Sequence, residues 1–172
     1  MPMRPVSVRV SSATFSNWIP VNRYPSSFAI GFGVSLSSGA SLTYTVQHTF
    51  DDIYERTYQR LSRSTTSLTI NKTNHGLSVA DWVQITGSPI WDGQYAVASV
   101  TDANNFVVTV ANTGVTAGNG WIQTARLFPH EDVASETTSM DGNYQFPPRA
   151  SRLIISSYSS GFADFTLITG GN

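Results

Sequence analysis

The chain has 172 residues and no cysteine, which excludes disulfides, thiolate metal sites and cysteine nucleophiles. Charged residues make up only 12% and the net charge is −1, which excludes a general electrostatic attraction to nucleic acid or to an anionic membrane. No stretch reaches the roughly 18 apolar residues of a membrane span, and residues 1–10 lack the apolar core of a signal peptide. These features predict a protein made and used in a cytosol.

Short runs in which apolar residues alternate with Ser, Thr and Gln predict β-strands along most of the chain, because a period of two places successive side chains on opposite faces. Turn signals such as Ser38-Gly39, Asp92-Gly93 and Asp141-Gly142 separate the runs. Many short strands at this spacing are typical of a sandwich or a barrel. The predicted strands are 6–11, 27–36, 41–50, 67–72, 82–86, 93–101, 105–111, 120–128, 152–158 and 163–168.

Residues 51–63 (DDIYERTYQRLSR) form the one segment with helical spacing, with Tyr54, Tyr58 and Leu61 at i, i+4 and i+7. An extended connector fits its Thr and Tyr content equally well, so both interpretations stay open. The segment carries alternating charge, including Arg60 and Arg63, which favours a solvated, salt-bridged surface over a binding patch.

Two composition changes predict domain boundaries, one near residues 62–66 and one near 124–129. The segment 63–125 has its own strands and turns and is expected to close a small five-stranded barrel. The flanks, 1–62 and 126–172, are expected to pair with each other into one discontinuous domain, because either alone would leave sheet edges and an apolar face uncovered. The ends of the inserted segment must then lie close together.

No group of residues predicts a catalytic or metal centre. His48, His75 and His130 are far apart in sequence. The run His130-Glu131-Asp132 does not favour a metal site, because three consecutive side chains rarely point at one ion and the middle one faces the other way on a strand. The chain has no G-x-S-x-G turn for a serine hydrolase and no glycine-rich phosphate loop. We therefore expect no catalytic residue, no metal and no cofactor.

Aromatic residues are the remaining candidates for a binding role, since exposed rings can stack sugars or bind a protein. Trp82, Tyr95, Phe106 and Trp121 lie in or beside apolar runs and are predicted to form the core of the inserted barrel. The aromatics next to proline or in turns are predicted to be exposed partner contacts: Trp18, Tyr24 and Trp91.

Several segments carry a resemblance to a known class of proteins. The flanks contain YTVQHTFDD at 44–52, FPH at 128–130, DGNYQFP at 141–147 and RLIISSYSSG at 152–161. These resemble small all-β virion proteins of tailed bacteriophages, of the capsid decoration or head-fibre type. The middle segment, with HGLSVADW at 75–82 and DGQYAV at 92–97, is similar to a small β-domain that recurs as an insertion in phage structural proteins.

The sequence and this resemblance together predict an all-β protein with a jelly-roll-like or sandwich host domain and an inserted barrel. The resemblance implies a non-enzymatic virion protein, assembled in the bacterial host cytoplasm, that binds the major capsid protein or other virion proteins. A homo-oligomer is expected because the charge-poor surface and the unguarded strands 6–11 and 163–168 invite pairing. The resemblance to virion proteins, and no particular residue, favours a trimer. The alternative function is a carbohydrate-binding or receptor-binding module of a tail or fibre protein.

Overall fold

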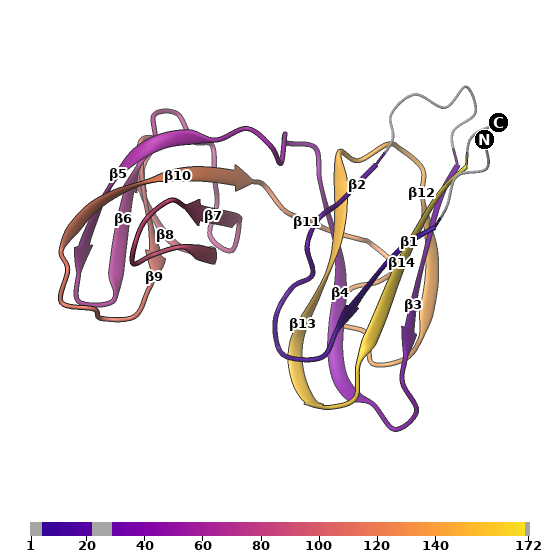
Figure 1. Cartoon of the computed structure of the whole chain (residues 1–172). Coiled ribbons are helices and arrows are strands. Elements are labelled where there is room, and N and C mark those ends of the chain that lie inside the picture. Colours follow the sequence, from indigo (N-terminus) through magenta and orange to yellow (C-terminus); the bar gives the residue numbers. More distant parts are fainter. Residues whose placement is uncertain (1–4, 22–28, 171–172) are drawn as a thin grey trace. The chain divides into compact units, whose positions relative to one another are not determined.

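The chain folds into two compact units, one formed by residues 1–50 with 128–172 and the other by residues 51–127. The structure is a computed structural model that describes residues 5–21 and 29–170 (Figure 1). Within these ranges it contains strands and no helix, so the all-β prediction is confirmed. No helix that could cross a membrane occurs in the same ranges.

The first unit, here called the sandwich, holds two four-stranded antiparallel sheets (Figure 1). The first sheet has the order β1-β14-β3-β12 and the second the order β11-β4-β13-β2. The strands of the first sheet are β1 (Val6–Val10), β14 (Ala163–Gly170), β3 (Ala29–Leu36) and β12 (Met140–Tyr144). Those of the second are β11 (Phe128–Pro129), β4 (Ser41–Thr49), β13 (Ala150–Ser160) and β2 (Ile19–Pro20).

This strand order is that of a jelly roll. In chain order the eight strands alternate between the two sheets at every connection but one, the connection from β4 to β11. Alternating side chains of both sheets fill one shared core, in which Phe32 and Phe165 of one sheet meet Tyr44 and Leu153 of the other. The predicted jelly-roll-like host domain is therefore confirmed.

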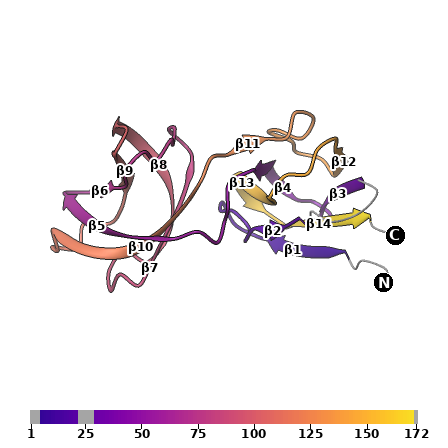
Figure 2. The ribbon, with the colours of Figure 1, turned by 90° about the horizontal axis from the view of Figure 1, so that it is seen from above.

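The second unit, here called the barrel, occupies the connection from β4 to β11. Its strands close in the order β10-β5-β6-β9-β8-β7, all antiparallel (Figure 2). Their bounds are β5 (Thr57–Ser64), β6 (Ser67–Asn71), β7 (Trp82–Thr86), β8 (Gly93–Asp102), β9 (Asn105–Thr109) and β10 (Ala117–Ala125). An aliphatic core with Phe106 and Trp91 fills the interior.

In segment 51–63 the structure decides between the helix and the extended interpretation and corrects the domain boundary. Residues 57–64 form strand β5 rather than a helix, and β5 closes the barrel between β10 and β6. The barrel therefore has six strands instead of the five expected. The boundaries at 62/63 and 125/126 are corrected to 50/51 and 127/128, because β5 pairs only with barrel strands.

The edge strands also differ in part from expectation. β1 lies at an edge of its sheet, as predicted for residues 6–11, but β14 pairs with β1 on one side and β3 on the other. The second edge strand is β12, and it contains Asp141 and Gly142, for which the sequence predicts a turn. Turn-type residues are tolerated in an edge strand because one side of that strand makes no hydrogen bonds to another strand of its sheet.

Candidate functional site

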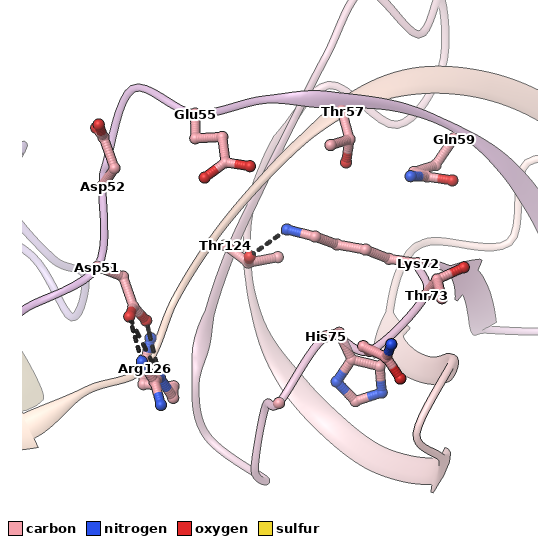
Figure 3. A pocket seen from close by; sticks show the side chains of 12 residues that line it. Asp51, Asp52, Glu55, Thr57, Gln59, Lys72, Thr73, His75, Thr124 and Arg126 are labelled. Carbon is pink, nitrogen blue, oxygen red and sulfur yellow. Dashed lines mark hydrogen bonds and ion pairs between the residues drawn. The ribbon is translucent and has the colours of Figure 1, made fainter.

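The barrel carries a polar cleft of about 590 Å³ (Figure 3). Its walls come from the segment before β5, from β5 itself, from the loop after β6 and from the end of β10. The lining residues are Asp51, Asp52, Glu55, Thr57, Gln59, Lys72, Thr73, Asn74, His75, Gly76, Thr124 and Arg126. We call this site the polar cleft.

Lys72 is the central cation of the polar cleft, and Figure 3 shows its side chain extending toward Thr124. Its ammonium donates a hydrogen bond to Thr124 Oγ1 over 2.8 Å. Burial lowers the pKa of Lys72, while the nearby carboxylates of Glu55 and Asp51 act in the opposite direction. An ammonium group has three protons to donate, so this residue can also bind a ligand oxygen.

Other groups of the polar cleft are already engaged in holding its walls. Asp51 accepts hydrogen bonds from the backbone N–H of Arg126 over 2.7 Å and from its guanidinium over 2.6 Å. His75 bonds the carbonyl oxygen of Asp102 through Nε2 over 2.9 Å and accepts from the N–H of Leu77 through Nδ1. Asp51 and His75 therefore shape the cleft, and a ligand would meet Lys72, Glu55 and the neutral side chains.

The sandwich carries a second concave site, of about 450 Å³, which sequence reasoning did not single out. Three rings surround it at an end of the unit: Phe50, Phe128 and Phe146 are exposed by 47%, 42% and 44%. Each ring centroid lies 5.5 to 5.8 Å from the imidazole of His48. The remaining lining residues are Pro129, His130, Glu131, Asp132, Asn143, Tyr144 and Gln145. We call this site the phenylalanine pocket.

His48 forms the floor of the phenylalanine pocket and is only 6% exposed. Burial, with a smaller contribution from His130, lowers the pKa of His48 to about 4. Its Nδ1 is buried without a hydrogen-bond partner in the part of the chain that the structure describes. The imidazole is therefore neutral at physiological pH, and the pocket gains no positive charge from it.

His130, beside His48, is held by two hydrogen bonds. Its Nε2 lies 3.0 Å from the carbonyl oxygen of Asn143, and its Nδ1 lies 3.3 Å from the backbone nitrogen of Asp132. Both ring nitrogens of His130 are therefore engaged by the backbone. No group of three or more metal-ligating side chains occurs within residues 5–21 and 29–170.

The predicted contact residues do not gather at either site. Trp91 is 2% exposed, so its predicted role as an exposed contact is wrong. Its indole packs against Gly118, where an added Cβ would lie 3.0 Å from the ring. Trp18 is half-buried with the Arg152 guanidinium 4.7 Å from its ring, and Tyr24 lies outside the described residues.

The predicted barrel core is correct for Phe106, which is 0% exposed and belongs to the core, and Tyr95 is partly buried against that core. Trp82 is 2% exposed but is not part of the barrel core, to which its neighbours Val83 and Ile85 belong.

Trp121 is 44% exposed and stacks edge-on against Tyr58 on the outside, so its assignment to the core is wrong. Alternation along β10 explains the error, because Gly120 and Ile122 point inward and the residue between them must point outward.

A signal for the phenylalanine pocket is visible in the sequence. Phe50, Phe128 and Phe146 each lie beside polar or proline residues, the same context that drew attention to Trp18. What the sequence does not show is their proximity, since β11 must pair with β4 to bring Phe128 opposite His48.

Comparisons with known proteins leave the family open. No protein-family model and no curated protein matches the chain. Among solved structures, it is similar to a chain described as a phage phi92 endosialidase, with 27% identity and a TM-score of 0.33. That similarity covers 47% of this chain and 15% of the other. Because this similarity is weak and covers less than half of the chain, neither a fold nor an activity follows from it.

Proposed function

We propose that this chain is a non-enzymatic structural protein of a bacteriophage virion, of the decoration or head-fibre type, whose sandwich unit attaches to coat or neighbouring virion proteins. The observation that carries the proposal is the phenylalanine pocket. Exposed aromatic side chains gathered around a concavity mark a surface that binds a partner, because rings left in water cost free energy that contact recovers.

The sequence resemblance supplies the virion context for this proposal. The fold is compatible with it but does not select it, since jelly rolls occur in viral capsid proteins and in lectins alike. Three of the segments that carry the resemblance, 44–52, 128–130 and 141–147, also contain Phe50, Phe128 and Phe146.

A homotrimer is part of the same proposal. β1 is an edge strand with a largely exposed residue pattern, and Val6 at its start is 51% exposed. An unpaired edge is a template for association, and a closed symmetric assembly protects it. Sedimentation equilibrium of the purified chain should give a mass of three protomers, whereas a single species at 18.7 kDa would contradict it.

The attachment is tested by a matched pair of variants. Phe146→Ser in the phenylalanine pocket and Trp121→Ser on the barrel each remove a ring that is 44% exposed. We expect Phe146→Ser to reduce co-sedimentation with phage particles that lack this protein, and Trp121→Ser to leave it unchanged. Equal binding by both variants would reject the sandwich surface as the attachment site, and absence of the chain from purified virions by mass spectrometry would reject the proposal.

Carbohydrate binding is the second candidate, and the polar cleft favours it. Lys72, Glu55, Gln59 and Asn74 present hydrogen-bond donors and acceptors side by side, which suits a ligand rich in hydroxyl groups. A glycan array with the whole chain tests this candidate. Glycan binding that is lost in Gln59→Ala but retained in Trp121→Ser would place the binding site in the polar cleft. If the chain bound no glycan, carbohydrate binding would be rejected.

A further inference from the structure

We propose that the phenylalanine pocket receives an arginine side chain of the protein to which the sandwich attaches. This inference rests on the proposed function and specifies the chemistry of the partner. It follows from the combination of exposed aromatic rings with carboxylates in one concavity.

The three phenylalanine rings supply the aromatic surface that an arginine side chain would contact. Phe50 lies 5.7 Å from Phe128 and 5.5 Å from Phe146 between ring centroids, so the rings form one aromatic cluster, and all three line the same concavity. The face of an aromatic ring carries partial negative charge and attracts a cation. A planar cation can contact a ring face while the surrounding rings exclude water.

Two carboxylates supply the negative charge that would pair with the arginine. Glu131 and Asp132 line the pocket and are both exposed. The ion pairs found among residues 5–21 and 29–170 join Arg9 to Asp164 and Asp51 to Arg126. Neither carboxylate of the pocket is used in them, so both are available to a basic side chain.

The remaining polar groups of the pocket do not oppose a cation. His48 is neutral because burial lowers its pKa to about 4. His130 is occupied by Asn143 and by the backbone N–H of Asp132. The Tyr144 hydroxyl is bonded to Ser151 over 2.7 Å. The charge of the lining is thus negative, which favours a cation over an anion.

The sandwich itself contains an example of the same recognition. The guanidinium of Arg9 lies 3.7 Å over the ring of Phe162, and its Nε and Nη2 each donate to Asp164 over 2.7 Å. Arginine suits this arrangement better than lysine, because its planar, weakly hydrated group can stack on a ring and donate two parallel hydrogen bonds at once.

The experiment uses the whole chain and three small probes: acetyl-arginine methylamide, its uncharged analogue acetyl-citrulline methylamide, and acetyl-lysine methylamide. Binding is followed by NMR shifts of the Phe ring and His48 resonances. We expect the arginine probe to bind at least about fivefold more tightly than either of the other two. Equal binding of citrulline would overturn recognition by charge, and equal binding of lysine would overturn the choice of arginine.

Variants locate the effect without disturbing the core. The double variant Glu131→Gln, Asp132→Asn changes exposed side chains only and should weaken the arginine probe about fivefold. Asp141→Asn, an exposed carboxylate on β12 outside this pocket, is the matched control and should have no effect. An unchanged affinity in the double variant would overturn the proposal.

Failure of this inference is distinguishable from failure of the proposed function. If Phe146→Ser abolishes attachment to particles while the arginine probe fails to bind, the surface is an apolar contact and the arginine assignment is rejected. If the arginine probe binds but Phe146→Ser still attaches to particles, the attachment surface lies elsewhere and the proposed use of the pocket is rejected.

Discussion

Gly142 is the residue on which the packing of Phe32 depends. An added Cβ at Gly142 would lie 2.7 Å from Cζ of Phe32, whose side chain is 3% exposed in the sandwich core. We expect Gly142→Ala to lower the free energy of unfolding of the sandwich by about 1–3 kcal/mol, since the ring must move out of its packed position. Urea denaturation followed by far-UV circular dichroism measures this change.

Gly33 in the neighbouring strand is the matched control for that substitution. An added Cβ at Gly33 meets nothing within 4 Å, and the residue is not among the glycines with positive φ. Gly33→Ala should change the free energy of unfolding by less than about 0.5 kcal/mol. Equal losses for both variants would mean that flexibility of the glycine backbone, and not room for Phe32, is what matters.

His48 should make the sandwich sensitive to acid. Its pKa is about 4 in the folded chain against about 6.5 for an unperturbed imidazole. As the pH falls, His48 is therefore protonated in the unfolded state before it is protonated in the folded state. The contribution of neutral His48 to the stability of the sandwich is complete above pH 6.5 and is lost as the pH falls toward 4. The loss amounts to about 3 kcal/mol when complete.

The test is the difference between the wild-type chain and His48→Leu. Both chains also contain His130, Glu131 and Asp132 near this position, so the difference between them reports the replacement of His48. The stability of the wild type should decrease more steeply between pH 6.5 and pH 4.5 than that of the variant. Parallel curves would show that the imidazole is not held neutral by the fold.

The Arg63 side chain joins the turn between β5 and β6 to the loop between β9 and β10. It is 6% exposed and donates from Nε to the carbonyl oxygen of Val115 and from Nη1 to Asn112 Oδ1 and the Thr65 carbonyl oxygen. Arg63→Met would leave these acceptors without a donor, so we expect the barrel to lose about 2–4 kcal/mol. Thermal unfolding monitored by tryptophan fluorescence reports it, because three of the four tryptophans, Trp82, Trp91 and Trp121, lie in the barrel.

Arg60, three positions earlier in β5, provides the control. It is exposed, and Arg60→Met should change the stability by less than about 0.5 kcal/mol. Similar losses in the two variants would indicate a general effect of charge removal on β5 rather than the buried hydrogen bonds.

The buried Arg63 also helps to explain why the sequence predicts some strands and not others. Strand β7 has the predicted bounds 82–86, because its alternation is clear and a turn follows at once. β5 was not predicted, since helical spacing of Tyr54, Tyr58 and Leu61 competes with a strand pattern that contains a buried arginine. Hydrophobic patterns cannot identify a buried arginine whose hydrogen-bond acceptors lie in the adjoining turn and in a loop about 50 residues away.

At the scale of the whole molecule, the discontinuous arrangement follows from the need to cover sheet edges, but the sites do not follow from the sequence. The phenylalanine pocket unites residues from three distant segments, around positions 48, 128 and 146, and depends on the register of β11 against β4. Register is set by turn geometry and by packing of both sheets, neither of which a single sequence displays.

The sandwich is expected to fold without the barrel. Phe128 pairs with His48, and the Phe50 and Phe128 rings lie 5.7 Å apart, so the chain leaves and re-enters the sandwich at neighbouring points. The ends of the barrel are likewise joined by the Asp51–Arg126 ion pair of 2.6 Å. Replacing residues 51–127 with a short Gly/Ser linker should leave a sandwich that unfolds cooperatively, because loop closure over so short a gap costs little entropy.

A deletion of 63–125 is the matched control for this experiment. It removes most of the barrel but keeps residues 57–62 of β5, including Leu61, which is fully buried in the intact chain. We expect the control to be less soluble and less stable than the deletion of 51–127, because an apolar strand loses the interior that covers it. If the 51–127 deletion showed no cooperative transition by circular dichroism, the sandwich would depend on the barrel for its fold, and the two units would have to be regarded as one folding domain.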